Sequence, residues 1–283
     1  MPVVLPDLPE VADHAIAGIA TVPAVELLDL LVRTVTARAP AGGVLQPSTL
    51  SMRAASFPRF LPVAEVPRCT FAVTLEDEAS DPRMGPRTRA TFTSRIALAG
   101  GMHRTRTHAA VTVGGSNPEI PQPPAVIAHD IELPAARVYQ ELIPFGPRFC
   151  NLRGLVRLGR DGGMATVRSP DPPRPARSPA GCPYLFDSAM HLACLWGQRY
   201  AGYVAYPTGF AARLITSPLA HGQRRCIVVP RSVESRHMVC DLWLTDESGP
   251  VCDAIVGLHM APLATGVLPP AWVVHPLAPR PLP

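Results

Sequence analysis

The chain has 283 residues, 47% of them hydrophobic, which is enough for one large domain or two fused small ones with a sizeable core. All of its basic residues are arginines, since lysine is absent, so a Schiff-base mechanism through lysine is excluded. A formal net charge of +4 is too small and too dispersed to indicate nucleic-acid binding, although it would suit an acidic protein partner.

The cysteines and the N-terminal residues indicate the cellular compartment in which the chain is expected. The 7 cysteines are odd in number and form no Cys-x-x-Cys pair, which argues against a disulfide framework and favours a reducing cytoplasm. The first residues, MPVVLPDLPEVADH, lack the basic start and apolar core of a signal peptide. No run approaches the roughly 18 apolar residues of a membrane span. We therefore expect a cytoplasmic protein that does not enter a membrane.

The first distinctive stretch is HAIAGIATVP, which places His14, Gly18 and Pro23 directly before an apolar, periodic segment. Apolar residues recur there at spacings of three and four, beginning at Val25, and Pro23 is placed to open a helix. The pattern predicts a helix over 23–38. A histidine, a glycine and a proline at these offsets are a weak signal when taken alone.

Alternating segments follow, and they indicate a meander of strands at 48–57, 69–77, 91–99 and 103–113. Residues 114–126 have no period and carry four prolines, which is typical of an extended linker. We therefore divide the chain into an N-terminal half, 1–120, and a C-terminal half, 121–283.

The second half repeats this plan. A strand at 151–158 precedes a proline-rich loop at 169–181, which leads into a second helix within 183–203. Strands then follow at 225–232, 237–245 and 251–260, the last two joined by the turn DESG. One long helix with an antiparallel sheet, found twice, predicts an α+β fold.

The second helix carries DSAMH, in which Asp187 and His191 lie four residues apart and so share one helical face. An aspartate among apolar residues is costly to bury as an anion. It is therefore paired, exposed on a polar stripe, or protonated with a raised pKa. An ordinary solvated pair of side chains fits the helix alone equally well.

FGPRF, residues 145–149, is the third constellation. By itself it indicates a turn whose flanking rings enter the core. Taken together, the three motifs resemble those of polyketide synthase dehydratase domains. HAIAGIATVP matches their His-x-x-x-Gly-x-x-x-x-Pro signature, FGPRF is similar to Tyr-Gly-Pro-x-Phe, and DSAMH is similar to Asp-x-x-x-Gln/His. The order also agrees, and the final hairpin extends the resemblance over nearly the whole chain.

This resemblance implies a double hot-dog fold, in which two antiparallel sheets each wrap around a long central helix. It implies that His14 removes the α-proton of a β-hydroxyacyl thioester and that Asp187, held protonated on its apolar helix, protonates the departing hydroxyl. His191 would orient Asp187 or bind the leaving hydroxyl. The substrate-binding residues that it implies are Gly18, Pro23, Ala24, Phe145, Gly146, Pro147 and Phe149.

Ala24 and Gly18 have a physical reason for these roles. The N–H of Ala24 lies at the electropositive start of the helix, where it can bind the thioester carbonyl as charge develops. Gly18 would let the preceding turn pass close to the substrate.

The resemblance further implies a substrate carried on the phosphopantetheine of an acyl carrier protein, other polyketide synthase domains as partners, and no metal or redox cofactor. Family analogy allows a homodimer. Four arginines could supply part of a docking surface for an acidic carrier, although a solvated basic face fits them as well; they are Arg137, Arg148, Arg153 and Arg157.

The chain departs from the family pattern at two positions. Phe145 stands where the family commonly has tyrosine, so any hydroxyl contact made there to the acid is missing. An altered substrate, a different donor such as Tyr139 or Tyr184, or a related reaction would each account for this change. Ala24 replaces a common glycine, which narrows the approach to its N–H. A dehydratase-like double-bond isomerase or oxa-cyclase would use the same base and acid. A catalytically silent acyl-binding module is the alternative from another class.

Other chemistry has little support in the sequence. His103 and His108 lie at odd spacing on a predicted strand and so on opposite faces, which disfavours a joint metal site. We find no glycine-rich phosphate loop after a strand and no Gly-x-Ser-x-Gly elbow.

Overall fold

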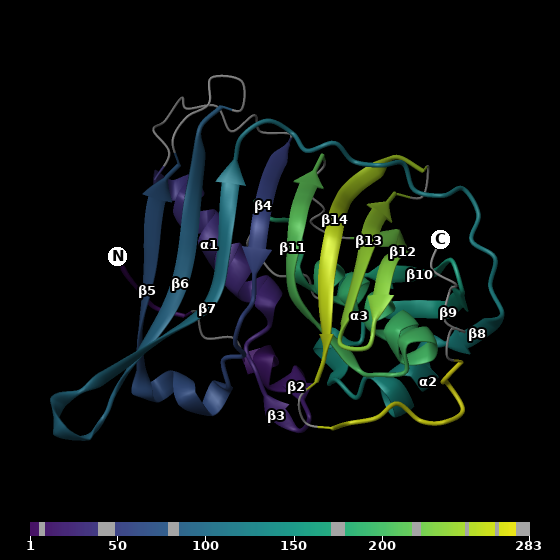
Figure 1. The fold of residues 1–283 in the computed structure, drawn as a ribbon, viewed down its shortest axis with the longest axis horizontal. Helices are drawn as coiled ribbons and strands as arrows, with labels where there is room; N and C mark the ends of the chain where they lie inside the picture. Colours follow the sequence, from purple (N-terminus) through teal and green to yellow (C-terminus); the bar gives the residue numbers. More distant parts are fainter. Residues whose placement is uncertain are drawn as a thin grey trace.

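A single antiparallel sheet organises the computed structural model, which describes residues 1–5, 9–38, 49–78, 85–170, 179–216, 222–246, 249–263 and 266–275. Within these residues 12 strands pair in the order β1-β5-β6-β7-β4-β11-β14-β13-β12-β10-β9-β8 (Figure 1). The strands are β1 (Pro2–Val3), β4 (Leu50–Ser56), β5 (Cys69–Asp77), β6 (Arg87–Ala97), β7 (His103–Gly114), β8 (Ile131–Pro134), β9 (Leu152–Gly159), β10 (Gly162–Arg168), β11 (Ala205–Ile215), β12 (Gln223–Glu234), β13 (His237–Thr245) and β14 (Val251–Pro262).

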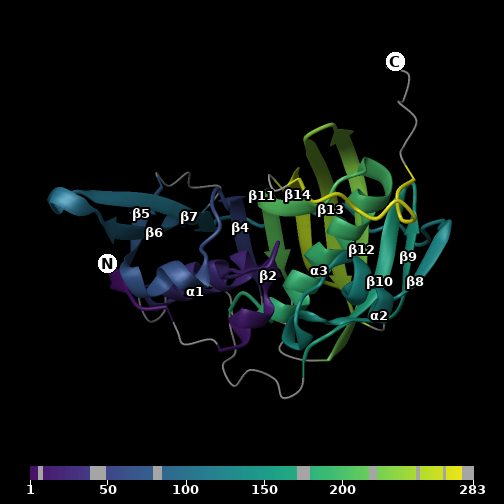
Figure 2. The ribbon, with the colours of Figure 1, turned by 90° about the horizontal axis from the view of Figure 1, so that it is seen from below.

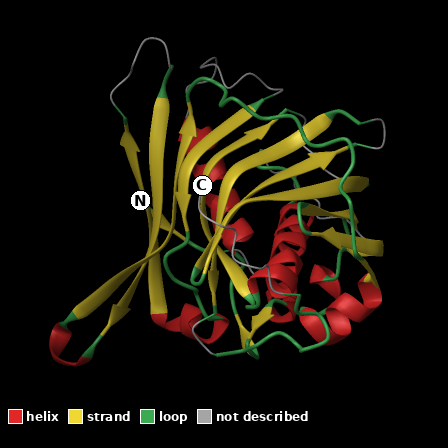
Figure 3. Cartoon of the chain, turned by 45° about the vertical axis from the view of Figure 1, so that its right-hand side comes forward, coloured by secondary structure: helices red, strands yellow, loops and turns green. Residues whose placement is uncertain are grey.

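Two long helices, α1 (Ala24–Arg38) and α3 (Pro183–Trp196), lie on the same side of this sheet (Figures 2 and 3). α1 packs one apolar face on β5, β6 and β7, as its spacing predicts. α3 is buried from Tyr184 to Trp196, because the second half of the sheet and the segments before it surround it. The helices also contact each other.

Shorter elements complete the fold. A hairpin of β2 (Ala15–Ile16) and β3 (Ile19–Ala20) pairs separately from the large sheet. The remaining short helices are η1 (Pro9–Asp13), η2 (Val63–Arg68), η3 (Ala99–Gly101), α2 (Ala135–Arg137), η4 (Val138–Leu142), η5 (Pro147–Phe149) and η6 (Gly197–Ala201).

The two halves meet at the pairing of β4 with β11, which runs from Leu50↔Ile215 to Ser56↔Gly209. The sheets expected as two are therefore joined into one. The sequence did not predict β11, because Pro207 and Gly209 interrupt its pattern. At Gly209 the backbone of Ala55 approaches so closely that a Cβ would collide with its carbonyl oxygen. Glycine thus permits the strand that unites the halves.

Most predicted elements are confirmed. β5 and β13 have the expected bounds, and α1, β4, β6, β7, β9, β12 and β14 differ by a few residues. The second helix is correct in its α-helical part, and η6 continues it. β8 and β10 were missed. The proline-rich loop at 169–181 and the turn DESG lie largely outside the described residues. The boundary between residues 120 and 121 falls between β7 and β8 and stays a prediction.

A buried ion pair connects the middle of the sheet with the start of α3. Arg213 on β11 is 1% exposed and donates to both carboxylate oxygens of Asp253 on β14, at 3.0 and 2.6 Å. It also donates to the carbonyl of Ala180 at 3.0 Å and lies 3.6 Å from the ring centroid of Phe186. The planar guanidinium satisfies groups from three elements at once.

Replacing Arg213 alone should therefore be costly. We expect Arg213→Met to lower the free energy of unfolding by about 3–5 kcal/mol, because it leaves the Asp253 carboxylate buried without its partner. The double variant Arg213→Met/Asp253→Leu should regain most of that loss, whereas Arg38→Ala, which breaks an exposed pair with Asp77, should cost about 0.5 kcal/mol or less. Urea denaturation measures all three; a loss under about 1 kcal/mol in Arg213→Met would contradict the assignment.

Candidate active site

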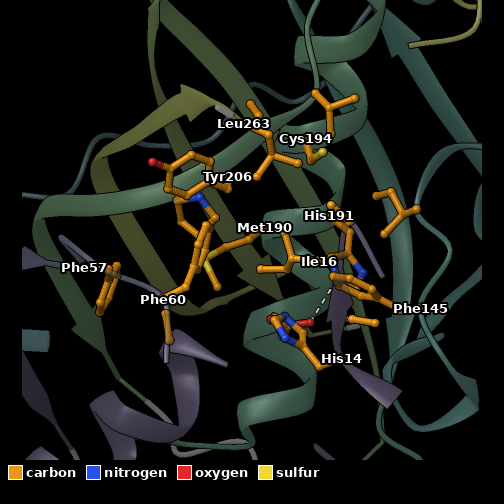
Figure 4. Close-up of a pocket in the computed structure, with 18 of the residues that line it drawn as sticks. His14, Ile16, Phe57, Phe60, Phe145, Met190, His191, Cys194, Tyr206 and Leu263 are labelled. Atoms are coloured by element: carbon orange, nitrogen blue, oxygen red, sulfur yellow. Dashed lines mark ion pairs between the residues drawn. The ribbon is translucent and has the colours of Figure 1, made fainter. Parts of the chain in front are cut away.

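A cavity of about 400 Å³ lies where the two halves meet. Its walls come from the β2–β3 hairpin, the starts of α1 and β11, α3, the end of β14 and the segment that includes Phe145. Most lining residues are apolar. In Figure 4, His14, Phe145 and His191 gather on one side, and Phe57 and Phe60 lie on the other. The imidazoles of His14 and His191 are therefore surrounded by apolar side chains of the cavity wall.

His14 is held by the hairpin that follows it. Its backbone carbonyl accepts from the N–H of Thr21 at 2.9 Å, and its ring Nδ1 lies 2.9 Å from the Thr21 carbonyl oxygen. A carbonyl only accepts, so Nδ1 carries the hydrogen and Nε2 presents a free lone pair. Ala17 and Gly18 form the tight turn, with φ values of +49° and +78°.

Asp187 lies between two imidazoles. His14 Nε2 is 3.9 Å from its Oδ1, and His191 Nε2 is 2.9 Å from its Oδ2. The three residues are 5–6% exposed. Although the second contact is short, neither Oδ2 nor His191 Nε2 makes a well-directed hydrogen bond to a described residue. Buried polar atoms left in this state are expected where a substrate completes the network.

The environment shifts two of these groups in defined directions. Burial lowers the pKa of His14, and the attraction of Asp187 and the Thr21 carbonyl opposes this only in part. His14 is thus a neutral base near pH 7. Burial raises the pKa of Asp187, but the charge of His191 when its ring is protonated, the contact with that ring and the charge of a protonated His14 outweigh burial and lower the pKa overall. The raised pKa expected from the sequence is therefore not found as long as these rings carry charge.

Behind His191 stands the hydroxyl of Tyr139, on the π-helical turn η4. This oxygen accepts the backbone N–H groups of Asn151 and Leu152, each at 2.9 Å, and lies 3.2 Å from His191 Nδ1. The structure therefore supplies a tyrosine hydroxyl from Tyr139, one of the two candidates that the sequence offered. The other, Tyr184, donates instead to Glu10 at 2.7 Å.

Phe145 packs between the imidazoles, with ring centroids 4.5 Å from His14 and 5.0 Å from His191. Its loop is fixed by the residue before the histidine. The carbonyl of Asp13 accepts from Gly146 N at 2.7 Å, and the Asp13 carboxylate accepts from Arg148 N at 3.0 Å. A Cβ at Gly146 would collide with the Asp13 carboxyl. The loop and the histidine are thus positioned together.

A sequence comparison shows the family to which the chain belongs. Residues 123–270, more than half of the chain, match the family described as polyketide synthase dehydratase N-terminal domain. The chain belongs to the polyketide synthase dehydratase family. No curated protein sequence matches it.

Solved dehydratase domains share the fold. The domain of PpsC from Mycobacterium tuberculosis has a TM-score of 0.71 and 21% identity, with 93% of this chain and 92% of that chain covered. The domain from the CurJ module of the curacin polyketide synthase has a TM-score of 0.69 and 16% identity, with 90% and 87% covered. The dehydratase domain of RzxB from Pseudomonas fluorescens has a TM-score of 0.68 and 14% identity, with 87% of this chain and 87% of that chain covered.

The structure brings together most of the residues that the sequence selected. His14, Gly18, Ala24, Phe145, Asp187 and His191 all line the cavity. Pro23, Gly146, Pro147 and Phe149 do not line it. Pro23 precedes α1, and the other three hold the loop and pack behind His14, with the Phe149 ring 5.1 Å from the imidazole. These four residues lie behind the wall of the cavity.

Sequence reasoning missed Asp13 and Thr21. Thr21 holds His14 through its backbone, and Asp13 holds the loop of Phe145 through its carbonyl and its carboxylate. No sequence motif indicates such contacts. It also missed a second polar group of the cavity, made by Arg59 and His108. His108 is held by Ser94 Oγ at 2.7 Å and by the Arg59 carbonyl at 3.2 Å. Among the described residues we find no cluster of three or more metal-ligating side chains and no helix long and apolar enough to cross a membrane.

Gly146 should tolerate no side chain. We expect Gly146→Ala to push the loop from Asp13 and to lower the free energy of unfolding by about 1–3 kcal/mol, because the new methyl group overlaps a well-packed carboxyl. Gly197→Ala is the control for loss of glycine, because Gly197 has a helical φ of −60° and an added Cβ would meet its nearest neighbour at an ordinary 3.4 Å. Thermal unfolding compares the two; equal losses would contradict the clash.

The burial of His14 should make the fold sensitive to acid. Above pH 6.5 the imidazole is neutral in the folded and the unfolded chain and contributes nothing. Below that value the unfolded chain binds a proton that the folded chain does not, so the free energy of unfolding falls, by up to about 1.4 kcal/mol per pH unit.

His14→Gln removes this titration and keeps an N–H for the Thr21 carbonyl. Its unfolding midpoint in urea should therefore fall less between pH 7 and about pH 5 than that of the parent. His108 has a pKa lowered by burial as well and stays in both proteins, so some acid sensitivity remains in the variant. Identical slopes would show that His14 takes up its proton in the folded state.

Proposed function

We propose that the chain is a dehydratase that removes water from β-hydroxyacyl thioesters carried by an acyl carrier protein in polyketide or polyketide-like biosynthesis. The observation that carries this proposal is the pair of His14 Nε2 and Asp187 Oδ1, which face each other at 3.9 Å inside an apolar cavity. The proposed fold is the double hot-dog, each half with its sheet around α1 or α3.

In this reaction His14 Nε2 takes the α-proton, and the electrons of that C–H bond form the Cα=Cβ double bond. The Cβ–O bond breaks, and the hydroxyl leaves as water with a proton from Asp187. The N–H of Ala24, the first residue of α1, has no intrahelical acceptor and would bind the thioester oxygen. A proton passed from His14 back to Asp187 through water restores the site.

The acid must hold a proton, whereas charged imidazoles lower the pKa of the Asp187 carboxyl in the unliganded site. An acyl chain that fills the cavity displaces water and adds to the burial that raises the pKa of Asp187. Substrate binding thus favours the form that can donate. The elimination is redox-neutral and uses a base, an acid and an N–H from the chain itself, so we propose no metal or redox cofactor.

Related domains support the assignment. PpsC has been solved in complex with C12:1-CoA, and a CurJ dehydratase mutant with a histidine replaced by phenylalanine is inactive. Partners in the proposal are a carrier protein and other polyketide synthase domains, in a reducing cytoplasm where the 7 cysteines stay unpaired as in the structure.

Two of the arginines considered for carrier docking are neutralised in the structure. Arg137 pairs with Glu141 at 2.8 Å and Arg157 pairs with Glu132 at 2.7 Å. Arg153 donates to the backbone carbonyl of Leu152 at 2.9 Å. These contacts weaken the case for this particular surface.

The proposal is tested with β-hydroxyacyl pantetheine thioesters, from butyryl to decanoyl, and with the matching enoyl thioesters, since the equilibrium can favour the hydrate. Mass spectrometry should show interconversion by one water. His14→Gln and Asp187→Asn should each lower kcat about 100-fold or more. His129→Gln and Asp161→Asn change the same residue types at surface positions and should leave it unchanged.

The products distinguish the alternatives. Double-bond migration or ring closure without exchange of water would assign the chain to the isomerase or cyclase reading. Thioester binding without any conversion would indicate the silent module. Either result would overturn the proposed dehydration.

A further inference from the structure

The hydrogen bonds behind Asp187 have a fixed direction. A tyrosine hydroxyl has one hydrogen and two acceptor lone pairs. In Tyr139 the oxygen already accepts two backbone N–H groups, from Asn151 and Leu152, at 2.9 Å each. Because amide N–H groups can only donate, the single hydroxyl hydrogen is left for the remaining neighbour, His191 Nδ1 at 3.2 Å.

This fixes the tautomer of His191. Nδ1 must accept, so in a neutral ring the hydrogen lies on Nε2, the nitrogen 2.9 Å from Asp187 Oδ2. A second proton would have to enter at Nδ1, where the hydroxyl hydrogen of Tyr139 already points, and within the described part of the chain this hydrogen has no other acceptor. Tyr139 therefore disfavours an imidazolium at this position.

We propose that Tyr139 is a positioning residue that keeps His191 neutral, with the ring hydrogen on Nε2, the nitrogen 2.9 Å from Asp187 Oδ2, so that the proton used on the leaving hydroxyl resides on Asp187. This inference rests on the proposed dehydration for its role but not for its geometry. Tyr139 has no place in the cavity lining, and it acts only through His191.

Few groups near His191 could hold the proton that is assigned to Asp187. The titratable groups that face it are Asp187 on its own helix, His14 from the segment before β2, and Tyr139 from η4. Burial raises the pKa of the Tyr139 phenol well above its usual value, so this group stays protonated and remains a donor. Phe145 closes the side between the imidazoles with an apolar ring.

Position 191 needs a side chain that accepts a hydrogen bond from Tyr139 and donates one toward Asp187. A glutamine could accept the Tyr139 hydrogen with its carbonyl oxygen and donate from its amide to Asp187, and it cannot take a proton. His191→Gln should therefore keep the function of a neutral, directed donor. A shorter His191→Asn cannot reach both partners.

The first test reads the tautomer without any substrate. In ¹⁵N-histidine NMR of the whole protein, His191 should show an unprotonated Nδ1 and a protonated Nε2, assigned by the signals lost in His191→Gln. In Tyr139→Phe we expect a mixture of tautomers or an imidazolium at pH 6. A protonated Nδ1 in the parent would overturn the inference, whatever the protein catalyses.

The second test uses the enoyl and β-hydroxyacyl thioesters. Tyr139→Phe should lower kcat about 10- to 100-fold and shift its pH profile, with a smaller change in KM, because orientation of the acid is lost while the cavity is kept. Tyr184→Phe, which removes a part-buried tyrosine hydroxyl from a neighbouring position, is the matched control and should change kcat little.

Tyr139→Phe also leaves two N–H groups without their acceptor, so a structural effect must be separated. In the His191→Gln background, where no tautomer or protonation can change, Tyr139→Phe should cost at most a few-fold in kcat. An equal loss in both backgrounds, with an unchanged pH profile, would reduce Tyr139 to a structural role and overturn the inference. An inactive parent with the expected tautomer would instead count against the proposed function alone.

Discussion

The burial of one carboxylate between two imidazoles in an apolar cavity is the constraint on which the rest of the structure depends. Charged groups lose hydration there, so each needs a fixed partner. The Thr21 carbonyl fixes the ring of His14, and the Tyr139 hydroxyl fixes that of His191. The tight turn at Ala17–Gly18 exists because Thr21 has to return to His14. Much of the irregular backbone near the site serves these contacts.

Joining the halves is the second requirement, since His14 and Asp187 come from different halves. The pairing of β4 with β11 makes the sheet continuous and brings α1 and α3 into contact on one side of it. Arg213 then ties β11 and β14 to the start of the helix that carries Asp187. Small shifts at this seam would change the 3.9 Å separation of His14 and Asp187, so the buried pair of Arg213 and Asp253 lies where position matters.

Periodic segments were predictable from sequence, and segments decided by tertiary contacts were not. β5 and β13 alternate cleanly, so their bounds were correct. β11 was missed because its Pro207 and Gly209 are acceptable only next to the particular backbone of β4. The motifs selected His14, Asp187 and His191, which do meet. The protonation of Asp187 could not be predicted, because it depends on imidazole distances rather than on the apolar sequence around it.

The exchange of a tyrosine for Phe145 shows how the site keeps its polarity when one hydroxyl is absent. A phenyl ring at this place excludes water from between the imidazoles, and that strengthens every remaining electrostatic contact. The hydroxyl of Tyr139 contacts His191 Nδ1 and is anchored by two backbone N–H groups, which can only donate. Each hydrogen bond in this series therefore has a fixed donor, from the backbone amides to Tyr139 and from Tyr139 to His191. Backbone geometry, rather than the acidity of any one side chain, thus favours the proton on Asp187 over one on His191.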